Sequence, residues 1–311
     1  MMNPKVLVAD PIDVSAVEIL KKAGFDVDLR PGIGANELES VVSGYDVLVV
    51  RGRTKVTSKV LERGVPRLKV VGRAGVGLDN VDLDAASKLG VKVLNTPESS
   101  TNSVAELVVG LMLAVARKIA WSDRVMRAGK WPKGEAMGVE LSGKTLGVVG
   151  FGRIGRKVAE VAYAMGMKII AYDVIKIPED VLAKTQAKLT SLEDLLRSAD
   201  VVTLHVPLTP ETRHLINAEK IALMKPSAIL VNASRGEVVD EQALVEALSS
   251  GRLAGAGLDV YEREPPTGSK LLELDNVVLT PHIGAQTVEA QEAAATMLAS
   301  KIVEVFTTSR P

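Results

Sequence analysis

The sequence predicts an α/β protein built from two doubly wound parallel sheets. Short runs rich in Val, Ile and Leu alternate with segments of helical periodicity along most of the chain, which is typical of parallel strands joined by helical crossovers. The chain has 311 residues, more than one hydrophobic core usually requires, and a length that indicates about two domains. A glycine-rich turn near the middle follows the first run of a second series.

The first series lies before residue 100. A helical pattern is expected after the first of its runs, at 14–23. β-Branched residues are concentrated in the predicted strands, which are 5–9, 46–50, 69–72 and 91–94. The second series predicts strands from 146 and from 169 onward, and at 201–204, 229–232, 255–260 and 277–279. No sequence repeat relates the two series, so we expect two α/β domains.

Two long helices are predicted outside these series. Residues 104–116 are apolar around most of the helix circumference, and Ser103 and Glu106 have the spacing of a capping box at its start. A helix without a polar face is expected to be buried on several sides, between domains or at a subunit interface, which makes a homodimer the expected assembly. The pattern at 287–306 predicts a second long helix that could return the chain to the first domain.

The glycine-rich turn predicts a dinucleotide-binding site. Gly150-x-Gly152-x-x-Gly155 follows an apolar run and precedes a helical segment. Gly150 would allow the tight turn, Gly152 would let the backbone approach a pyrophosphate at the positive end of the helix, and Gly155 would let the helix pack on the strand. This is the arrangement of a Rossmann domain, and Arg153 and Ile154 in the same turn are candidate cofactor contacts.

An acidic residue ends the next predicted strand. Asp173 lies 18 residues after Gly155, close to the spacing of the carboxylate that accepts hydrogen bonds from the ribose hydroxyls of NAD. A carboxylate there also repels the additional phosphate of NADP. The sequence therefore predicts NAD as the cofactor, with an ordinary strand-end carboxylate as the alternative.

Composition excludes several classes of function. Lys plus Arg and Asp plus Glu both number 38, so the chain lacks the positive charge that indicates a nucleic-acid partner. The absence of cysteine excludes disulfides and thiolate sites, and we expect no metal. The sequence has neither the pattern of a signal peptide nor the roughly 20 apolar residues of a membrane span. We therefore expect a soluble, cytoplasmic protein without a membrane partner.

The search for an acid or base near neutral pH is short, because the chain has only three histidines. His282 is the strongest candidate, since it follows a predicted strand and open α/β sheets bind ligands at the carboxyl ends of their strands. His205 also follows a strand and is expected to line the cofactor cleft with Pro207. His214 lies in a polar turn and is expected to be a surface residue.

Two charged residues follow other predicted strands. Arg235 comes after 229–232, where a guanidinium could hold a carboxylate with two parallel hydrogen bonds. Glu264 comes after 255–260, and the proline that follows it restrains the chain there. Each alone would be an ordinary solvated side chain. Together with His282 they supply an anion anchor, a carboxylate and an acid–base group.

Several further segments stand in order around the glycine fingerprint: Gly72-Arg-Ala-Gly-Val-Gly-Leu-Asp-Asn-Val-Asp82, Asn95-Thr-Pro97, Asn232-Ala-Ser-Arg-Gly236, Asp259-Val-Tyr-Glu-Arg-Glu-Pro265 and Thr280-Pro-His-Ile-Gly284. With these segments the chain resembles the D-isomer-specific 2-hydroxyacid dehydrogenases, and within them most closely the D-3-phosphoglycerate dehydrogenases. The resemblance covers nearly the whole chain. It implies a flavodoxin-like substrate-binding domain at 1–96 and 286–311, with the Rossmann NAD-binding domain at 97–285 inserted between.

The resemblance also implies the roles of individual residues. It makes Arg235, Glu264 and His282 the catalytic set, with His282 as general base in oxidation and general acid in reduction. Ala233 would contact the cofactor, and Asp259 would contact its nicotinamide side. The lobes would close over the cofactor by a hinge motion.

The implied activity is NAD-dependent oxidation of D-3-phosphoglycerate to 3-phosphohydroxypyruvate, the first step of serine biosynthesis. The loop with Arg73, Val76 and Gly77 would bind the substrate carboxylate through backbone N–H groups. Arg51 matches the family position that meets phosphate, and Lys133 lies in a segment that reaches across the dimer in relatives. The alternative is that Arg51 and Lys133 belong to a solvated rim of cations.

Two other functions remain open at this point. A glyoxylate or hydroxypyruvate reductase of the same family would use the same catalytic set on a smaller acid. A non-enzymatic, NAD-sensing corepressor would instead need an exposed peptide-binding cleft and long tails. Because the sequence ends soon after Phe306, we expect neither such a tail nor the serine-binding regulatory domain, and therefore no feedback inhibition by serine.

Overall fold

The structure is a computed structural model that describes residues 3–308. The chain divides into two compact units: the first runs to Ser100 and resumes at Ala285, and the second is Thr101–Gly284. Each unit contains one parallel sheet with helices on both faces. The predicted fold class, two doubly wound α/β domains, is therefore confirmed.

The first unit contains a five-stranded parallel sheet in the order β2-β1-β3-β4-β5. This is the strand order of the flavodoxin-like fold, as expected. Its elements are β1 (Lys5–Val8), α1 (Val14–Lys22), β2 (Asp26–Leu29), α2 (Ala35–Val41), β3 (Val47–Val50), α3 (Ser58–Gly64), β4 (Val70–Arg73), α4 (Leu83–Lys88), β5 (Lys92–Asn95) and α12 (Val288–Thr308).

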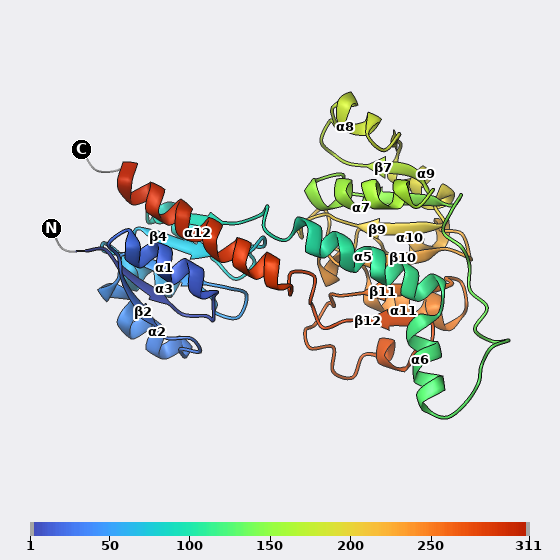
Figure 1. Cartoon of the computed structure of the whole chain (residues 1–311), viewed down its shortest axis with the longest axis horizontal. Coiled ribbons are helices and arrows are strands. Elements are labelled where there is room, and N and C mark those ends of the chain that lie inside the picture. The colour runs from blue at the N-terminus through green and yellow to red at the C-terminus, as the bar shows by residue number, and fades with distance from the viewer. Residues whose placement is uncertain (1–2, 309–311) are drawn as a thin grey trace. The chain divides into compact units, whose positions relative to one another are not determined.

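The two faces of this sheet bury different helices, because successive side chains of a strand point to opposite faces. In β1, Val6 and Val8 pack with α1 and α12, whereas Leu7 packs in the cluster that includes residues of α2, α3 and α4. Figure 1 shows α12, coloured red, beside α1. The predicted C-terminal helix is thus confirmed, and it completes one face of the sheet that begins the chain.

The second unit contains a seven-stranded parallel sheet in the order β12-β11-β10-β9-β6-β7-β8. The chain order reverses at β6, as it does in the Rossmann fold. Its elements are α5 (Thr101–Ala116), α6 (Ile119–Arg127), β6 (Thr145–Val149), α7 (Arg153–Ala164), β7 (Lys168–Tyr172), α8 (Glu179–Ala183), β8 (Lys188–Leu189), α9 (Leu192–Ser198), β9 (Val201–Leu204), α10 (Ala218–Leu223), β10 (Ile229–Asn232), α11 (Glu241–Ser249), β11 (Gly255–Leu258) and β12 (Val277–Leu279).

The apolar helix α5 is buried within its own unit. It packs on α7 and on strands β10, β11 and β12, and Val108, Leu111 and Met112 are almost inaccessible to solvent. The capping box expected at its start is wrong: the helix begins two residues before Ser103, whose hydroxyl instead donates to the Gly284 carbonyl at 2.6 Å. A serine in the first turn of a helix can satisfy a neighbouring loop rather than its own helix end.

Candidate active site

The glycine turn after β6 has the geometry that the motif predicts. Gly150 adopts φ +91°, and a Cβ there would lie 2.6 Å from the carbonyl oxygen of His205. A Cβ on Gly155 would lie 2.2 Å from the Gly150 carbonyl oxygen. Gly150 therefore requires glycine because the backbone after β9 passes directly against it, and Gly155 requires it because α7 packs on the turn that starts the helix.

The same turn fits a dinucleotide. Gly152 is the N-cap of α7, no side chain caps the helix there, and a Cβ at Gly152 would meet nothing within 4 Å. Arg153 and Ile154 form the first turn of the helix, with Arg153 exposed and Ile154 partly buried. Open space at the N-terminus of a helix that no side chain caps is what a pyrophosphate needs, so the residues present suit NAD.

Asp173 lies directly after β7 and is fixed by the glycine turn. Its carboxylate accepts hydrogen bonds from the N–H groups of Phe151 at 2.7 Å and Ile175 at 2.9 Å, one on each oxygen. A carboxylate oxygen can accept more than one hydrogen bond. Asp173 therefore keeps acceptor capacity for ribose hydroxyls while its position is held by the backbone.

The remaining predicted cofactor residues follow neighbouring strands of the same sheet. His205 and Pro207 follow β9, Ala233 follows β10, and Asp259 follows β11. Since the strands are parallel, these residues gather at the carboxyl edge. Burial lowers the pKa of His205 to about 3, and its Nε2 lies 3.0 Å from the Thr203 hydroxyl. His205 is therefore neutral at physiological pH and unsuited to be the acid–base group.

His282 and Glu264 form a hydrogen-bonded pair. The distance from His282 Nδ1 to Glu264 Oε2 is 2.8 Å, and the two side chains are 51% and 40% exposed, so a substrate can reach them. The Glu264 hydrogen bond raises the pKa of His282, against the opposing effects of burial and of the Arg235 charge. Burial favours the neutral form of Glu264, but the hydrogen bond and charge of His282 dominate together and hold the pKa of Glu264 below its ordinary value.

Asp259 determines the conformation of the loop that carries His282. This buried carboxylate accepts hydrogen bonds from the Thr280 hydroxyl and from the N–H groups of Ile283 and Gly284. The backbone carbonyl of Asp259 accepts from the His282 N–H group at 2.9 Å. These contacts hold His282 at φ +55°, a conformation that non-glycine residues seldom adopt. The structure thus gives Asp259 a positioning role, and its predicted nicotinamide contact stays a prediction.

Arg235 lies beside this pair because a glycine follows it. A Cβ on Gly236 would lie 1.9 Å from the carbonyl carbon of Tyr261, so the loop after β10 touches the loop that leads to Glu264. Arg235 is partly buried, and its charge acts on the pKa of both Glu264 and His282. The second unit therefore brings all three predicted catalytic residues together.

The His214 side chain contacts Glu262, in the loop that leads to Glu264. Its Nε2 lies 2.8 Å from Glu262 Oε1, and the side chain is 44% exposed. The histidine thus makes a surface ion pair when protonated, and it contacts neither Glu264 nor His282 within the described residues. This placement agrees with the surface position expected from the sequence.

The predicted carboxylate loop belongs to the first unit. Gly75, at φ +135°, donates its N–H to the buried Thr96 hydroxyl at 2.8 Å, and Asn95 Nδ2 donates to the Val76 carbonyl at 2.7 Å. A Cβ on Gly75 would lie 1.6 Å from Arg73 Nη1, so the guanidinium lies over this glycine. Gly77 continues the loop and is partly buried. Sequence reasoning did not identify Thr96 as a support of this loop, although Asn95-Thr-Pro was among the matching segments.

The two cations predicted to meet phosphate differ in their surroundings. Arg51 directly follows β3 and is partly buried, whereas Lys133 is exposed in the segment after α6. Neither side chain makes a hydrogen bond or ion pair with another residue between 3 and 308. Each is therefore available to an external anion.

No group of three or more His, Asp or Glu side chains between residues 3 and 308 could hold a metal ion. Over the same range, no helix has both the length and the apolar character needed to cross a membrane.

Comparison with known proteins identifies relatives over almost the whole chain. Residues 109–284 match the family model for the NAD binding domain of the D-isomer specific 2-hydroxyacid dehydrogenases. The chain is 50% identical over 303 residues to D-3-phosphoglycerate dehydrogenase of Methanocaldococcus jannaschii, covering 97% of this chain and 57% of that relative. It is 49% identical over 306 residues to hydroxypyruvate reductase of Thermotoga maritima, covering 97% of this chain and 98% of that relative. The chain thus spans little more than half the length of the first relative.

Solved structures of similar proteins share the fold of this chain. A crystal structure of the TT0316 protein of Thermus thermophilus has a TM-score of 0.90 and 39% identity over 99% of this chain and 98% of that one. Glyoxylate reductase of Paecilomyes thermophila has a TM-score of 0.89 and 31% identity over 97% of this chain and 95% of that one. By its family-model match, its identity to near full-length relatives and its site, the chain belongs to the D-isomer specific 2-hydroxyacid dehydrogenase family, whose cofactor is NAD.

Proposed function

We propose that the protein catalyses the NAD-dependent oxidation of D-3-phosphoglycerate to 3-phosphohydroxypyruvate, the first step of serine biosynthesis. The observation that carries the activity is the His282–Glu264 pair at 2.8 Å with Arg235 beside it. Oxidation of a 2-hydroxyacid removes a hydride from carbon and a proton from oxygen. A histidine held by a carboxylate, next to a cation for the substrate anion, suits that double transfer.

The mechanism assigns one task to each side chain. Bound NAD supplies the acceptor for the hydride. Because Nδ1 of His282 is held by Glu264, Nε2 is the ring atom that takes the hydroxyl proton in oxidation and returns it in reduction. The carboxylate of Glu264 stabilises the imidazolium that forms. Arg235 holds the substrate carboxylate and polarises the reacting oxygen, which keeps the carbon in place for transfer.

The cofactor contacts follow from the carboxyl edge of the second sheet. Gly150, Gly152 and Gly155, with Arg153 and Ile154, would hold the pyrophosphate. Asp173 would bind the ribose hydroxyls and exclude NADP. The nicotinamide half would lie against the remaining predicted contacts, which are His205, Pro207, Ala233 and Asp259.

The phosphorylated substrate is proposed because of the first unit. Arg51 offers a guanidinium without a partner among residues 3–308, and a guanidinium recognises phosphate with paired hydrogen bonds. The loop of Arg73, Val76 and Gly77 is proposed to bind the carboxylate end of the acid. Lys133 is proposed as a second cation near phosphate.

A second candidate substrate is the unphosphorylated acid. Hydroxypyruvate reductase of Thermotoga maritima matches this chain over 98% of its own length, whereas the phosphoglycerate dehydrogenase of Methanocaldococcus jannaschii is matched over 57%. A hydroxypyruvate or glyoxylate reductase would keep His282, Glu264 and Arg235 in the same roles. It would leave Arg51 without a partner in the bound substrate.

The deciding experiment compares NADH-dependent reduction of phosphohydroxypyruvate, hydroxypyruvate and glyoxylate, with kcat/KM as the measure. The proposal expects a clear preference for the phosphorylated acid, and a KM for that acid that rises in Arg51→Gln. A wild-type preference for hydroxypyruvate or glyoxylate would move the protein to the reductase branch. Loss of reduction of all three acids in His282→Ala is expected under both assignments.

We further propose a cytoplasmic homodimer. Large apolar side chains are exposed in and after α6: Trp131 is 76% and Met137 79% exposed, and Ile119, Met126 and Val139 are exposed as well. Exposed apolar side chains concentrated in one segment are typical of protein contact surfaces. Sedimentation of the purified protein should give twice the chain mass, and a monomer at micromolar concentration would contradict the proposal.

A further inference from the structure

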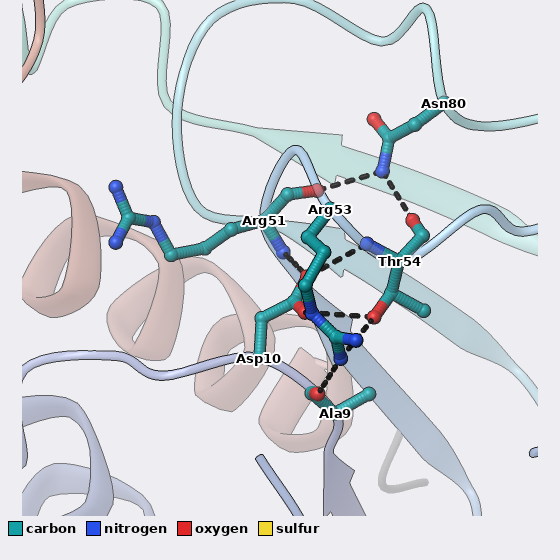
Figure 2. Close-up of polar contacts among 6 residues, drawn as sticks. All are labelled: Ala9, Asp10, Arg51, Arg53, Thr54 and Asn80. Atoms are coloured by element: carbon teal, nitrogen blue, oxygen red, sulfur yellow. Dashed lines mark hydrogen bonds and ion pairs between the residues drawn. The ribbon is translucent and has the colours of Figure 1, made fainter. Parts of the chain in front are cut away.

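The loop after β3 is built around one buried carboxylate. Asp10, two residues after β1 and 1% exposed, accepts hydrogen bonds from the N–H group of Arg51 at 2.7 Å and from the N–H group and hydroxyl of Thr54 at 3.2 and 2.7 Å. The fourth donor is Nε of Arg53 at 3.0 Å. Figure 2 shows these contacts converging on Asp10. The carboxylate of Asp10 thus links the loop after β1 to the loop after β3.

The charge of Asp10 is balanced inside this cluster. Burial favours the neutral acid, but the N–H group of Arg51, both Thr54 donors and the Arg53 charge together hold the pKa of Asp10 below its ordinary value. Arg53 also donates Nη2 to the Ala9 carbonyl at 3.1 Å and to the Thr54 hydroxyl at 3.2 Å. The guanidinium of Arg53 is therefore committed to the loop itself.

Asn80 fixes the same loop from the other side. Its Nδ2 donates to the carbonyl oxygens of Arg51 and Thr54, both at 2.6 Å. The backbone of Arg51 is consequently held at its N–H group by Asp10 and at its carbonyl by Asn80. In Figure 2 the Arg51 side chain extends away from Asp10, while the Arg53 side chain folds back over it. Two neighbouring arginines thus have opposite roles.

We propose that Asp10 is the positioning residue for phosphate recognition: it holds the Arg53 guanidinium within the loop and fixes the Arg51 backbone, so that the Arg51 guanidinium, and not that of Arg53, projects toward the substrate phosphate. This inference rests on the proposed phosphoglycerate activity. Fixing the backbone before binding reduces the ordering cost that a flexible arginine would incur. Specificity for a phosphorylated acid then depends on a residue that never touches it.

The test measures the ratio of kcat/KM for phosphohydroxypyruvate to kcat/KM for hydroxypyruvate in Asp10→Asn. An amide can accept at one side-chain atom only, so the substitution removes acceptors for the loop while keeping its volume. We expect the ratio to fall about 10- to 100-fold, the range for losing a hydrogen bond to a charged group. The fall should come from the KM for the phosphorylated acid, with kcat much less affected.

The matched control is Asp46→Asn at the other end of β3. Asp46 also accepts from a backbone N–H group, that of Lys5 at 2.8 Å, and from Arg67 at 3.1 Å. A general loss of stability in the first unit would act through either aspartate, so an unchanged ratio in Asp46→Asn isolates the positioning role. If Asp10→Asn does not fold, Thr54→Val removes one hydroxyl of the cluster and should lower the ratio in the same direction.

A double-substitution cycle separates this inference from the proposed function. In an Arg51→Gln background, Asp10→Asn should lower the ratio no further, because both changes remove the same contact. If Arg51→Gln lowers the ratio but Asp10→Asn leaves it within twofold of wild type, the positioning role is overturned and the proposed function stands. If Arg51→Gln itself leaves the ratio unchanged, the phosphate assignment fails and the inference fails with it.

Discussion

Replacing Gly236 with alanine should greatly reduce catalysis, because the added Cβ would force two loops of the site apart. The added Cβ would lie 1.9 Å from the carbonyl carbon of Tyr261 and 2.5 Å from the amide nitrogen of Glu262. Ordinary van der Waals contact begins at 3.4 Å, so the loop of Arg235 and the loop that leads to Glu264 must separate by about 1.5 Å. Neither contact atom is the end of a flexible side chain, and the backbone itself has to move.

A displacement of this size is large for a catalytic site. Misplacement by about 1 Å can cost about 100-fold in rate, so we expect kcat in Gly236→Ala to fall by about 100-fold or more. Overpacking should also lower the free energy of unfolding by about 1–3 kcal/mol. The affinity for NADH should fall much less than kcat, because the glycine turn and Asp173 follow β6 and β7, and only the proposed nicotinamide contacts Ala233 and Asp259 lie in the displaced loops.

Steady-state reduction of the preferred acid, a fluorescence titration with NADH and thermal unfolding together test this expectation. Gly110→Ala is the matched control, since Gly110 lies within α5 and a Cβ there would meet nothing within 4 Å. That variant should keep its turnover and gain about 0.5–1 kcal/mol from the helix propensity of alanine. A Gly236→Ala protein with kcat within twofold of wild type would refute the packing argument.

Three further predictions concern the site residues. His282→Ala should lower turnover by about 10²- to 10⁴-fold with an unchanged dissociation constant for NADH, and full turnover would disprove the acid–base role. Since Glu264 raises the pKa of His282 above 6.5, His282 stays protonated to higher pH, and the rate of reduction should fall only as pH rises through that raised pKa. Glu264→Gln should therefore move this limb of the pH–rate profile to lower pH, and an unmoved limb would assign it to another group. Asp173→Asn should narrow the preference for NADH over NADPH, measured as a ratio of kcat/KM, because it removes the repulsion of the additional phosphate.

Much of the fold could be predicted because local residue types determine it. The runs at Val201–Leu204, Ile229–Asn232 and Val277–Leu279 are strands with the predicted bounds, since buried parallel strands consist of continuous apolar residues. Strand β2, Asp26–Leu29, was not predicted. It lies at the edge of its sheet with two aspartates among four residues and a half-exposed burial pattern, so it lacks that apolar signal.

The supports of the site were harder to predict than its members. His282, Glu264 and Arg235 each follow a strand, so the parallel topology places them at one edge. Asp10 and Thr96 act through partners 41 to 44 residues and 21 residues away in the chain, and no local pattern marks such pairings. Asp259 was singled out for the cofactor, and its hydrogen bonds to the His282 loop depend on how that loop folds back.

The position of α12 has a consequence for synthesis on the ribosome. The helix supplies Ala294, Leu298 and Ile302 to the cluster that covers β1, β3 and β4, yet it is translated after the whole of the second unit. At about 5–20 residues per second, the first sheet waits roughly 10 to 40 s for this helix with one apolar face incompletely covered. The second unit is contiguous in the chain and can fold during that interval. The second unit can therefore finish folding before the first unit does. During translation, the first sheet is the part of the nascent chain that most needs a chaperone.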